Sequence, residues 1–290
     1  NSPRRGSWMI EKIFPYFLMI QIFLQRTIPH VRDIYDRMGT KSNIEWTEFT
    51  WNPATGCTKI SPGCKHCYAE VMADRLQAMG APGYEHGFKL TLHPDRLTQP
   101  LKRKKPTTYF VNSMSDLFHE DIPFEYLDQV FDVIRQTPQH TYQILTKRAD
   151  QMEAYFQNRE VPVNAWLGVS VEDKKYGLPR IDYLRRVKAA TRFLSVEPLL
   201  EDLGVFDLTD IHWVIVGGES GNKARPMKPE WVENIANQCI AAGTAFFFKQ
   251  WGTWGADGVK RTKHANGREF QGRTWDGTPT SPQMSFALTS

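Results

Sequence analysis

Three of the four cysteines fall within eleven residues, in the run WNPATGCTKISPGCKHCYAE (51–70). Six residues separate Cys57 from Cys64, and two separate Cys64 from Cys67. Three thiolates so close in sequence can share one metal centre, and the glycines and proline between them let the loop fold around it. A 4Fe–4S cluster with three cysteine ligands would leave one iron open to a small molecule. Zinc is the alternative, with His66 or a distant residue as fourth ligand; unliganded reduced thiols are the third.

The cysteine content also bears on the cellular compartment. A chain of 290 residues has no need of a disulfide framework, and clustered cysteines favour metal binding over two disulfides. Cys239 lies alone in an apolar helical pattern, where a free cysteine behaves as a small buried apolar residue. We therefore expect reduced thiols and a cytoplasmic protein.

A second group of reactive side chains closes a series of short apolar runs. In a parallel barrel the active site forms at the carboxyl ends of the strands, so these residues would meet at one rim. A pocket for a charged small molecule needs such a set, although strand ends are often polar simply because they meet water. The candidates are Asn112, Lys147, Arg148, Ser170, Glu172, Glu197, Gly217, Gly218, Glu219, Lys249 and Gln250.

Alternating strand-like and helix-like segments position these residues. Near-continuous apolar runs such as WLGVSV and WVIVGG are typical of strands covered on both faces. We predict strands over residues 44–51, 89–93, 108–112, 142–146, 165–171, 192–197, 212–217 and 245–249. Helices are predicted over residues 68–79, 124–136, 149–158, 178–189 and 229–242. The fold class is α/β, a complete or partial (β/α) TIM-like barrel of six to eight mostly parallel strands.

The chain divides into three parts. Residues 1–37 carry an apolar stretch from Ile13 to Leu24 that is too short to span a membrane, and Met38 opens a conventional-looking sequence. We expect 1–37 to be an upstream-translated or non-native extension, 38–254 to be the barrel, and 255–290 to be a polar loop and tail. Beyond residue 37, 30 basic residues nearly balance 29 acidic ones, which argues against a broad electrostatic grip on nucleic acid.

Several motifs together resemble the phage Gp37/Gp68 family, DUF5131: the cysteine run 51–70, FVNSMSDLFHE (110–120), ILTKR, LGVSVE, SVEPLL, VGGESG and FFKQWG. The resemblance implies a radical-SAM-like barrel with a three-cysteine motif, which some members combine with a three-Cys-motif partner protein. Two features depart from the common radical SAM pattern. The first cysteine gap has six residues instead of three, and the Gly-Gly-Glu motif ends the seventh predicted strand instead of the second.

The resulting prediction is an iron–sulfur enzyme that cleaves S-adenosylmethionine (SAM) to a 5′-deoxyadenosyl radical and modifies or repairs a substrate such as a nucleic-acid base or nucleotide. A reductant such as flavodoxin or ferredoxin would supply the electron. The predicted ligands are Cys57, Cys64 and Cys67; the cofactor contacts are Tyr68, Asn112, Ser170, Glu172, Glu197, Gly217, Gly218 and Glu219; the catalytic residues are Lys147, Glu197 and Glu219.

Two other functions remain open. A non-catalytic barrel stabilised by zinc or a cluster could bind a partner protein, or nucleic acid through the basic run Lys102–Lys105 and the aromatic residues Trp251 and Trp254. Paired carboxylates, Glu197 and Glu219, could instead support hydrolysis.

Overall fold

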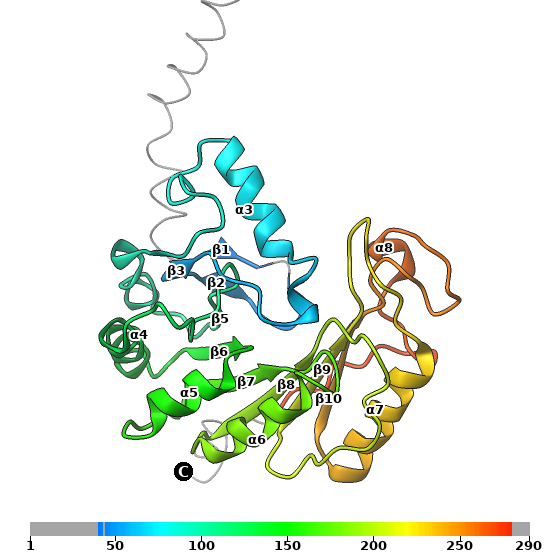
Figure 1. Ribbon diagram of the computed structural model, residues 1–290. Helices are drawn as coiled ribbons and strands as arrows, with labels where there is room; N and C mark the ends of the chain where they lie inside the picture. Colours follow the sequence, from blue (N-terminus) through cyan, green and yellow to red (C-terminus); the bar gives the residue numbers. More distant parts are fainter. Residues whose placement is uncertain (1–39, 43, 280–290) are drawn as a thin grey trace, which may run out of the picture.

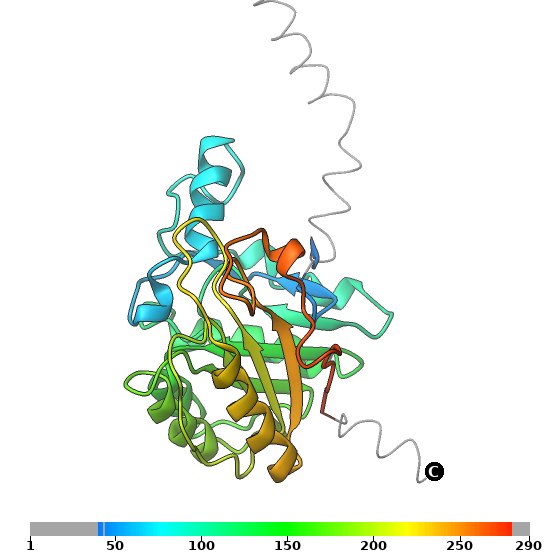
Figure 2. The same ribbon diagram turned by 90° about the vertical axis from the view of Figure 1, so that its right-hand side faces the viewer.

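A computed structural model describes residues 40–42 and 44–279, so the predicted extension 1–37 lies outside the described residues. Eight strands form one sheet in the order β1-β2-β5-β6-β7-β8-β9-β10. Only β1 pairs antiparallel, with β2; the seven strands from β2 to β10 are parallel and curl into a half-barrel (Figures 1 and 2). The strands are β1 Thr40–Lys41, β2 Phe49–Trp51, β5 Thr108–Val111, β6 Thr141–Thr146, β7 Ala165–Ser170, β8 Thr191–Val196, β9 Trp213–Gly217 and β10 Ala245–Gln250. The α/β partial-barrel prediction is confirmed.

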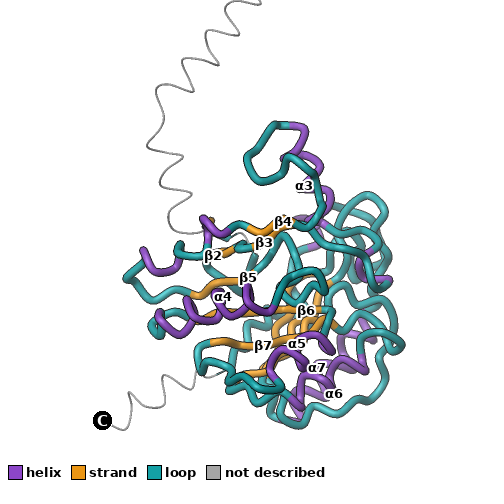
Figure 3. The backbone as a smooth tube through the Cα atoms, turned by 60° about the vertical axis from the view of Figure 1, so that its left-hand side comes forward, coloured by secondary structure: helices purple, strands orange, loops and turns teal. Residues whose placement is uncertain are grey.

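Helices cover the outer face of this sheet (Figure 1). The α-helices are α3 Tyr68–Ala78, α4 Phe124–Gln136, α5 Ala149–Phe156, α6 Leu178–Arg186, α7 Pro229–Ala242 and the short α8 Lys263–Asn266. In α4, Leu127, Val130, Phe131 and Ile134 recur at helical spacing and are all buried, so one apolar stripe fixes the helix on the sheet. The five helices α3 to α7 match the predicted ones, and of these α3 projects from the body beside the cysteine loop (Figure 3).

The inner face of the half-barrel changes character along the strands. Its amino-terminal half is filled by large rings that pack edge-to-face or tilted against one another: Trp46, Phe110, Trp166, Phe193, Trp213 and Phe247. Toward the carboxyl ends, the parallel register continues these rows with Ser170 and Ser195, which face the same side. Aromatic side chains therefore fill the amino-terminal end of the half-barrel, and the polar side chains lie at its carboxyl rim.

One predicted barrel strand belongs elsewhere. Within residues 89–93, only β4 (Thr91–Leu92) is a strand, and it pairs antiparallel with β3 (Ala54–Thr55) in a separate two-stranded sheet. A run this short, followed at once by the 3-10 helix Pro94–Arg96, is too brief to cross the half-barrel. The prediction of a second barrel strand there is wrong, and the small sheet supports the base of the cysteine loop instead.

The carboxyl-terminal segment packs on the half-barrel as far as it is described. Phe270 belongs to the main apolar core, and Trp275 packs against it. Phe248 donates its backbone N–H to the carbonyl of Trp275 at 2.9 Å, and Trp213 Nε1 donates to the carbonyl of Gly277 at 2.7 Å. Phe270 and Trp275 therefore extend the core, within a segment for which the sequence predicted a polar loop and tail. Across the described residues, no helix is long and apolar enough to cross a membrane.

Candidate metal centre on the carboxyl rim

The cysteine loop is fixed at its base to the end of β5. Gly56 donates its N–H to the Met114 carbonyl at 2.9 Å, and Ser115 Oγ donates to the Gly56 carbonyl at 2.6 Å. Gly56 has a φ of +82°, and a Cβ there would lie 2.1 Å from the carbonyl oxygen of Lys89. Only glycine fits so close to the backbone in this conformation. Cys57 therefore enters the loop directly above the carboxyl rim.

The first contact between the loop and the rim is made by Arg148, which follows β6 and is only 4% exposed. Its Nη1 donates to Cys57 Sγ at 3.4 Å, and its Nη2 donates to Thr58 Oγ1 at 2.7 Å. Two carboxylates hold the other side of the guanidinium: Glu120 at 2.5 Å from Nε and Asp116 at 3.4 Å from Nη1. Burial and the nearby Asp116 raise the pKa of Cys57 to about 11, and Arg148 opposes that rise.

A second contact joins the middle of the loop to β7 and α6. Ser61 Oγ donates to Oε1 of Glu172, a fully buried carboxylate that follows β7. Arg180 Nη1 donates to the other carboxylate oxygen, Oε2, at 2.6 Å. Burial would raise the pKa of Glu172, but the positive charges of Lys147 and Arg180 hold it below its ordinary value. Glu172 is thus an ionised anchor for the loop.

A third contact joins the loop to the segment after β9. Arg225 makes a two-pronged ion pair with Glu219, with Nε 2.9 Å from Oε2 and Nη2 2.5 Å from Oε1. The same Nη2 donates to the Pro62 carbonyl at 3.1 Å, and His66 Nδ1 lies 3.3 Å from Glu219 Oε1 without hydrogen-bond geometry. Burial opposes ionisation of Glu219, but the hydrogen bonds from Arg225 lower its pKa. Glu219 therefore also holds the loop.

Glu197, the carboxylate at the end of β8, pairs with Lys249 of β10 at 2.8 Å and 2.9 Å to its two oxygens. Their side chains are 21% and 16% exposed, so the pair remains accessible from the rim. Gly217 and Gly218 lie beside it, but a Cβ on Gly218 would meet the Trp251 carbonyl at 2.0 Å. The close approach that Gly218 permits is therefore with the chain itself.

The remaining predicted contacts lie at the ends of β5, β6 and β7 and at the start of α3. Lys147 Nζ donates to Ser170 Oγ at 3.1 Å. Asn112 accepts from the Ala54 N–H through Oδ1 at 3.3 Å, while its buried Nδ2 has no hydrogen-bond partner among the described residues. Tyr68 is 59% exposed, and its hydroxyl donates to the Ser113 carbonyl. Of these side chains, Asn112 alone holds a buried donor ready for a ligand.

The donor set can be compared with the two predicted centres. All three cysteines are free thiols of intermediate exposure, and Lys59 interacts electrostatically with both Cys64 and Cys67. Within the described part of the chain, no three His, Cys, Asp or Glu side chains gather closely enough to hold one metal ion. A zinc ion with bonds of about 2.3 Å needs its ligand atoms about 4 Å apart. A cluster instead binds each cysteine to a different iron. The choice between the two centres, and iron binding itself, stays a prediction.

The residues proposed for the nucleic-acid-binding alternative lie far from the cysteine loop or make contacts within the fold. Trp251 is buried and donates through Nε1 to the Glu269 carbonyl at 2.8 Å, and Trp254 Nε1 donates to the Ala224 carbonyl at 2.7 Å. The basic run 102–105 precedes β5, at the opposite end of the strands, and Arg103 there lies over the Phe49 ring. Trp251 is therefore not free for base stacking, and Trp254 is partly buried.

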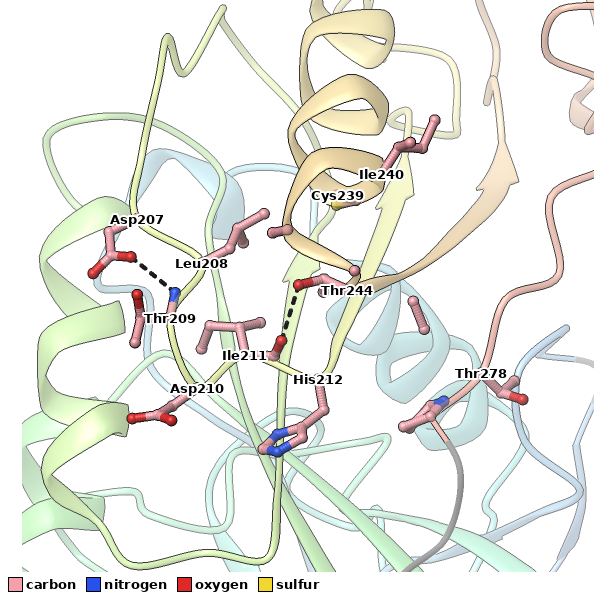
Figure 4. A pocket seen from close by; sticks show the side chains of 14 residues that line it. Asp207, Leu208, Thr209, Asp210, Ile211, His212, Cys239, Ile240, Thr244 and Thr278 are labelled. Carbon is pink, nitrogen blue, oxygen red and sulfur yellow. Dashed lines mark hydrogen bonds between the residues drawn. The ribbon is translucent and has the colours of Figure 1, made fainter.

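An open hollow also lies at that opposite end (Figure 4). Asp210, Ile211 and His212 line it just before β9, and Gly243, Thr244 and Ala245 line it where α7 passes into β10. Thr244 Oγ1 donates to the Ile211 carbonyl at 3.1 Å, which closes part of its wall. Cys239 lines this hollow, which the length of the strands separates from the cysteine loop 57–67.

The fold and rim define an α/β half-barrel protein with a thiol-rich loop tied to the carboxyl ends of its strands. Residues 41–279 match the model of a family described as "Protein of unknown function (DUF5131)", and the chain belongs to that family. A search of the curated proteins found no match.

Among solved structures, the chain is similar to spore photoproduct lyase. A variant with dinucleoside spore photoproduct gives a TM-score of 0.42 at 15% identity, covering 69% of this chain and 65% of that one. A variant with bound AdoMet and dinucleoside spore photoproduct gives 0.38 at 15%, covering 62% and 60%. The chain thus spans less than two thirds of those proteins, and likeness at this level describes neither an activity nor a substrate of this chain.

Proposed function

We propose that this protein is an iron–sulfur enzyme of the radical SAM type, with Cys57, Cys64 and Cys67 as the cluster ligands. One observation carries the proposal: the cysteine loop lies on the carboxyl rim of a parallel half-barrel and is tied by charged side chains to the ends of three strands. In parallel barrels that rim is where active sites form. A purely structural metal would have little reason to be held there by so many buried charges.

A bound 4Fe–4S cluster would supply the electron for reductive cleavage of SAM. The chain's own residues bind and orient the reactants. Asn112 Nδ2, a buried donor at the end of β5 without a partner among the described residues, would donate to a carboxylate or ribose oxygen of SAM. Glu197, held by Lys249, is a partly accessible carboxylate of the rim and would accept a hydrogen bond from a hydroxyl or ammonium group at its Oε atoms. Lys147 contacts an anionic group of the substrate.

In this proposal the carboxylates take different roles. Glu172 and Glu219, predicted as cofactor contacts, are saturated by Arg180 and Arg225, so they position the loop and leave Glu197 to meet the reactants. Gly217 lies against the Glu197 carboxylate, and a Cβ there would make a tight contact with it at 3.1 Å. Ser170 fixes Lys147, and the exposed ring of Tyr68 overhangs the rim at the start of α3.

The proposal extends to substrate and partners. A nucleic-acid base or nucleotide is the proposed substrate, and a flavodoxin or ferredoxin is the proposed reductant. The affiliation with phage Gp37/Gp68, the three-Cys-motif partner protein and the cytoplasmic location are parts of the same proposal. The first two follow from the sequence resemblance, and the location follows from the clustered, reduced cysteines.

Anaerobic purification followed by iron and sulfide analysis tests the cluster. Cys64→Ala is expected to lose most of its iron, because it removes one of three ligands. Cys239→Ala is the matched control: Cys239 is a fully buried thiol in α7, and its replacement should leave iron content unchanged. A colourless wild-type protein with one zinc per chain would overturn the cluster assignment.

Enzymatic function needs a separate measurement. Reduced, iron-loaded protein incubated with SAM should release 5′-deoxyadenosine, and Cys64→Ala should not. Iron-loaded protein that leaves SAM intact, with and without added oligonucleotide, would argue for a structural cluster instead.

A further inference from the structure

Arg148 is the one arginine of the described residues whose side chain donates to a cysteine sulfur. The other two rim arginines reach the loop only through a carboxylate or a carbonyl. Arg148 is also held more completely than either, by two carboxylates and by both oxygens of Thr58. Its guanidinium is buried and its geometry is set by four groups, so its direction toward Cys57 is fixed.

We propose that Arg148 is a positioning residue that holds the Cys57 ligand in place and raises the reduction potential of the cluster; this rests on the proposed function. A hydrogen bond to a ligand sulfur and a nearby positive charge both stabilise the reduced, more negative cluster. The cluster's potential is set partly by net charge and by such hydrogen bonds. Among the described residues, a charged side chain donates to Cys57 only, and the hydrogen-bond partner of Cys64 is the neutral Ser61 hydroxyl at 3.7 Å, so the three ligands are inequivalent.

The surrounding carboxylates tune this effect. Asp116 is buried and also accepts from Thr146 Oγ1 at 2.6 Å and from the Lys147 N–H at 2.9 Å, so it fixes the guanidinium from inside the fold. Glu120 is 51% exposed and approaches Nε from the solvent side. Removing the Glu120 charge leaves Arg148 less compensated and should raise the potential. Removing the Arg148 charge should lower it.

Potentiometric titration with detection of the reduced cluster by electron paramagnetic resonance tests these opposite signs. Arg148→Gln is expected to shift the midpoint potential to more negative values, and Glu120→Gln to more positive values. Arg148→Lys keeps the positive charge but loses the planar guanidinium group with its fixed N–H donors. The midpoint potential of this variant should therefore lie between those of Arg148→Gln and wild type. Arg159→Gln, which removes an exposed pair with Asp128 beyond α5, should leave the potential unchanged.

If Arg148 and Glu120 only stabilised the fold, the midpoint potentials of Arg148→Gln and Glu120→Gln would shift in the same direction or would not shift. Equal potentials in Arg148→Gln and wild type would overturn the proposal. Failure of the wild type to bind iron would overturn the proposed function instead, and the contact itself can then be tested on metal-free protein. In a double-mutant cycle of Arg148→Gln and Cys57→Ala, the changes in unfolding free energy should be non-additive. Additive changes would refute the pairing of Arg148 with Cys57.

Discussion

Replacing Arg180 by alanine should destabilise the fold strongly, because it leaves the carboxylate of Glu172 buried without its main partner. Glu172 is fully buried, and Arg180 donates to it at 2.6 Å and to the Ser170 carbonyl at 2.8 Å. Breaking a buried ion pair by removing one partner costs about 3–5 kcal/mol. Lys147 still attracts the carboxylate and Ser61 still donates to it, so we expect about 3 kcal/mol.

Urea denaturation at pH 7 measures this loss, with Arg186→Ala as the matched control. Arg186 lies on the same helix and pairs with Glu153 at 2.5 Å, but both side chains are substantially exposed. Exposed pairs contribute about 1 kcal/mol or less. Equal losses in the two variants would refute the argument from burial.

The pH dependence gives an independent check on the same pair. In the wild type the native pKa of Glu172 is lowered, so its contribution to stability is present above the unfolded value near 4.5 and lost as the pH falls below it. In Arg180→Ala, burial dominates and raises the native pKa above the unfolded value. The native variant then binds the extra proton, so its deficit relative to wild type should shrink between pH 7 and pH 5. A constant deficit over that range would contradict an unpaired carboxylate as the cause.

Two further predictions concern other parts of the fold. Burial and the charge of Arg96 lower the pKa of His93 to about 4, so the unfolded chain binds a proton first on acidification. Wild-type protein should lose about 1–2 kcal/mol between pH 7 and pH 5, and His93→Gln should lose less; a pH-independent difference would contradict this. A Cβ on Gly168 would meet the Phe193 ring at 2.5 Å, and one on Gly218 would meet a backbone carbonyl at 2.0 Å. Thermal unfolding should show Gly168→Ala weakened by about 1–3 kcal/mol and Gly218→Ala by more, because the end of a side chain can shift more readily than a backbone carbonyl; the reverse order would count against it.

The sequence predicted the strands of the half-barrel well because their apolar runs are long and buried on both faces. Ala165–Ser170 is buried at every position, and α4 and α7 begin and end where their patterns indicated. The prediction for residues 89–93 was wrong because a short strand-like run does not indicate which strand it pairs with. Its neighbour β3 has only two residues and no recognisable pattern, so the small sheet could not be foreseen.

The candidate site was predicted in its location and only partly in its contacts. Glu172, Glu197 and Glu219 each lie at or just after the carboxyl end of a predicted parallel strand, and this position was sufficient to predict that they share one rim with the cysteine loop. Their partners Arg180, Arg225 and Lys249 lie on later segments, and nothing in the spacing says which carboxylate each will meet. A signal did exist for two of them: Arg180 and Arg225 each follow their glutamate within eight residues, Arg180 in the first turn of α6 and Arg225 between β9 and α7.

The ion pairs around the rim explain how the loop 57–67 keeps its place. No residue of this segment is buried, so apolar packing cannot hold it as it holds the strands. Its order depends instead on Arg148, Glu172 and Glu219, which belong to three separate strand-to-helix connections. Removing any one of these three contacts by substitution should make the cysteine loop less ordered, although the three cysteines themselves are unchanged. Iron retention should therefore fall in Arg180→Ala while remaining near wild type in Arg186→Ala, and this difference links the stability of the half-barrel to the integrity of the metal centre.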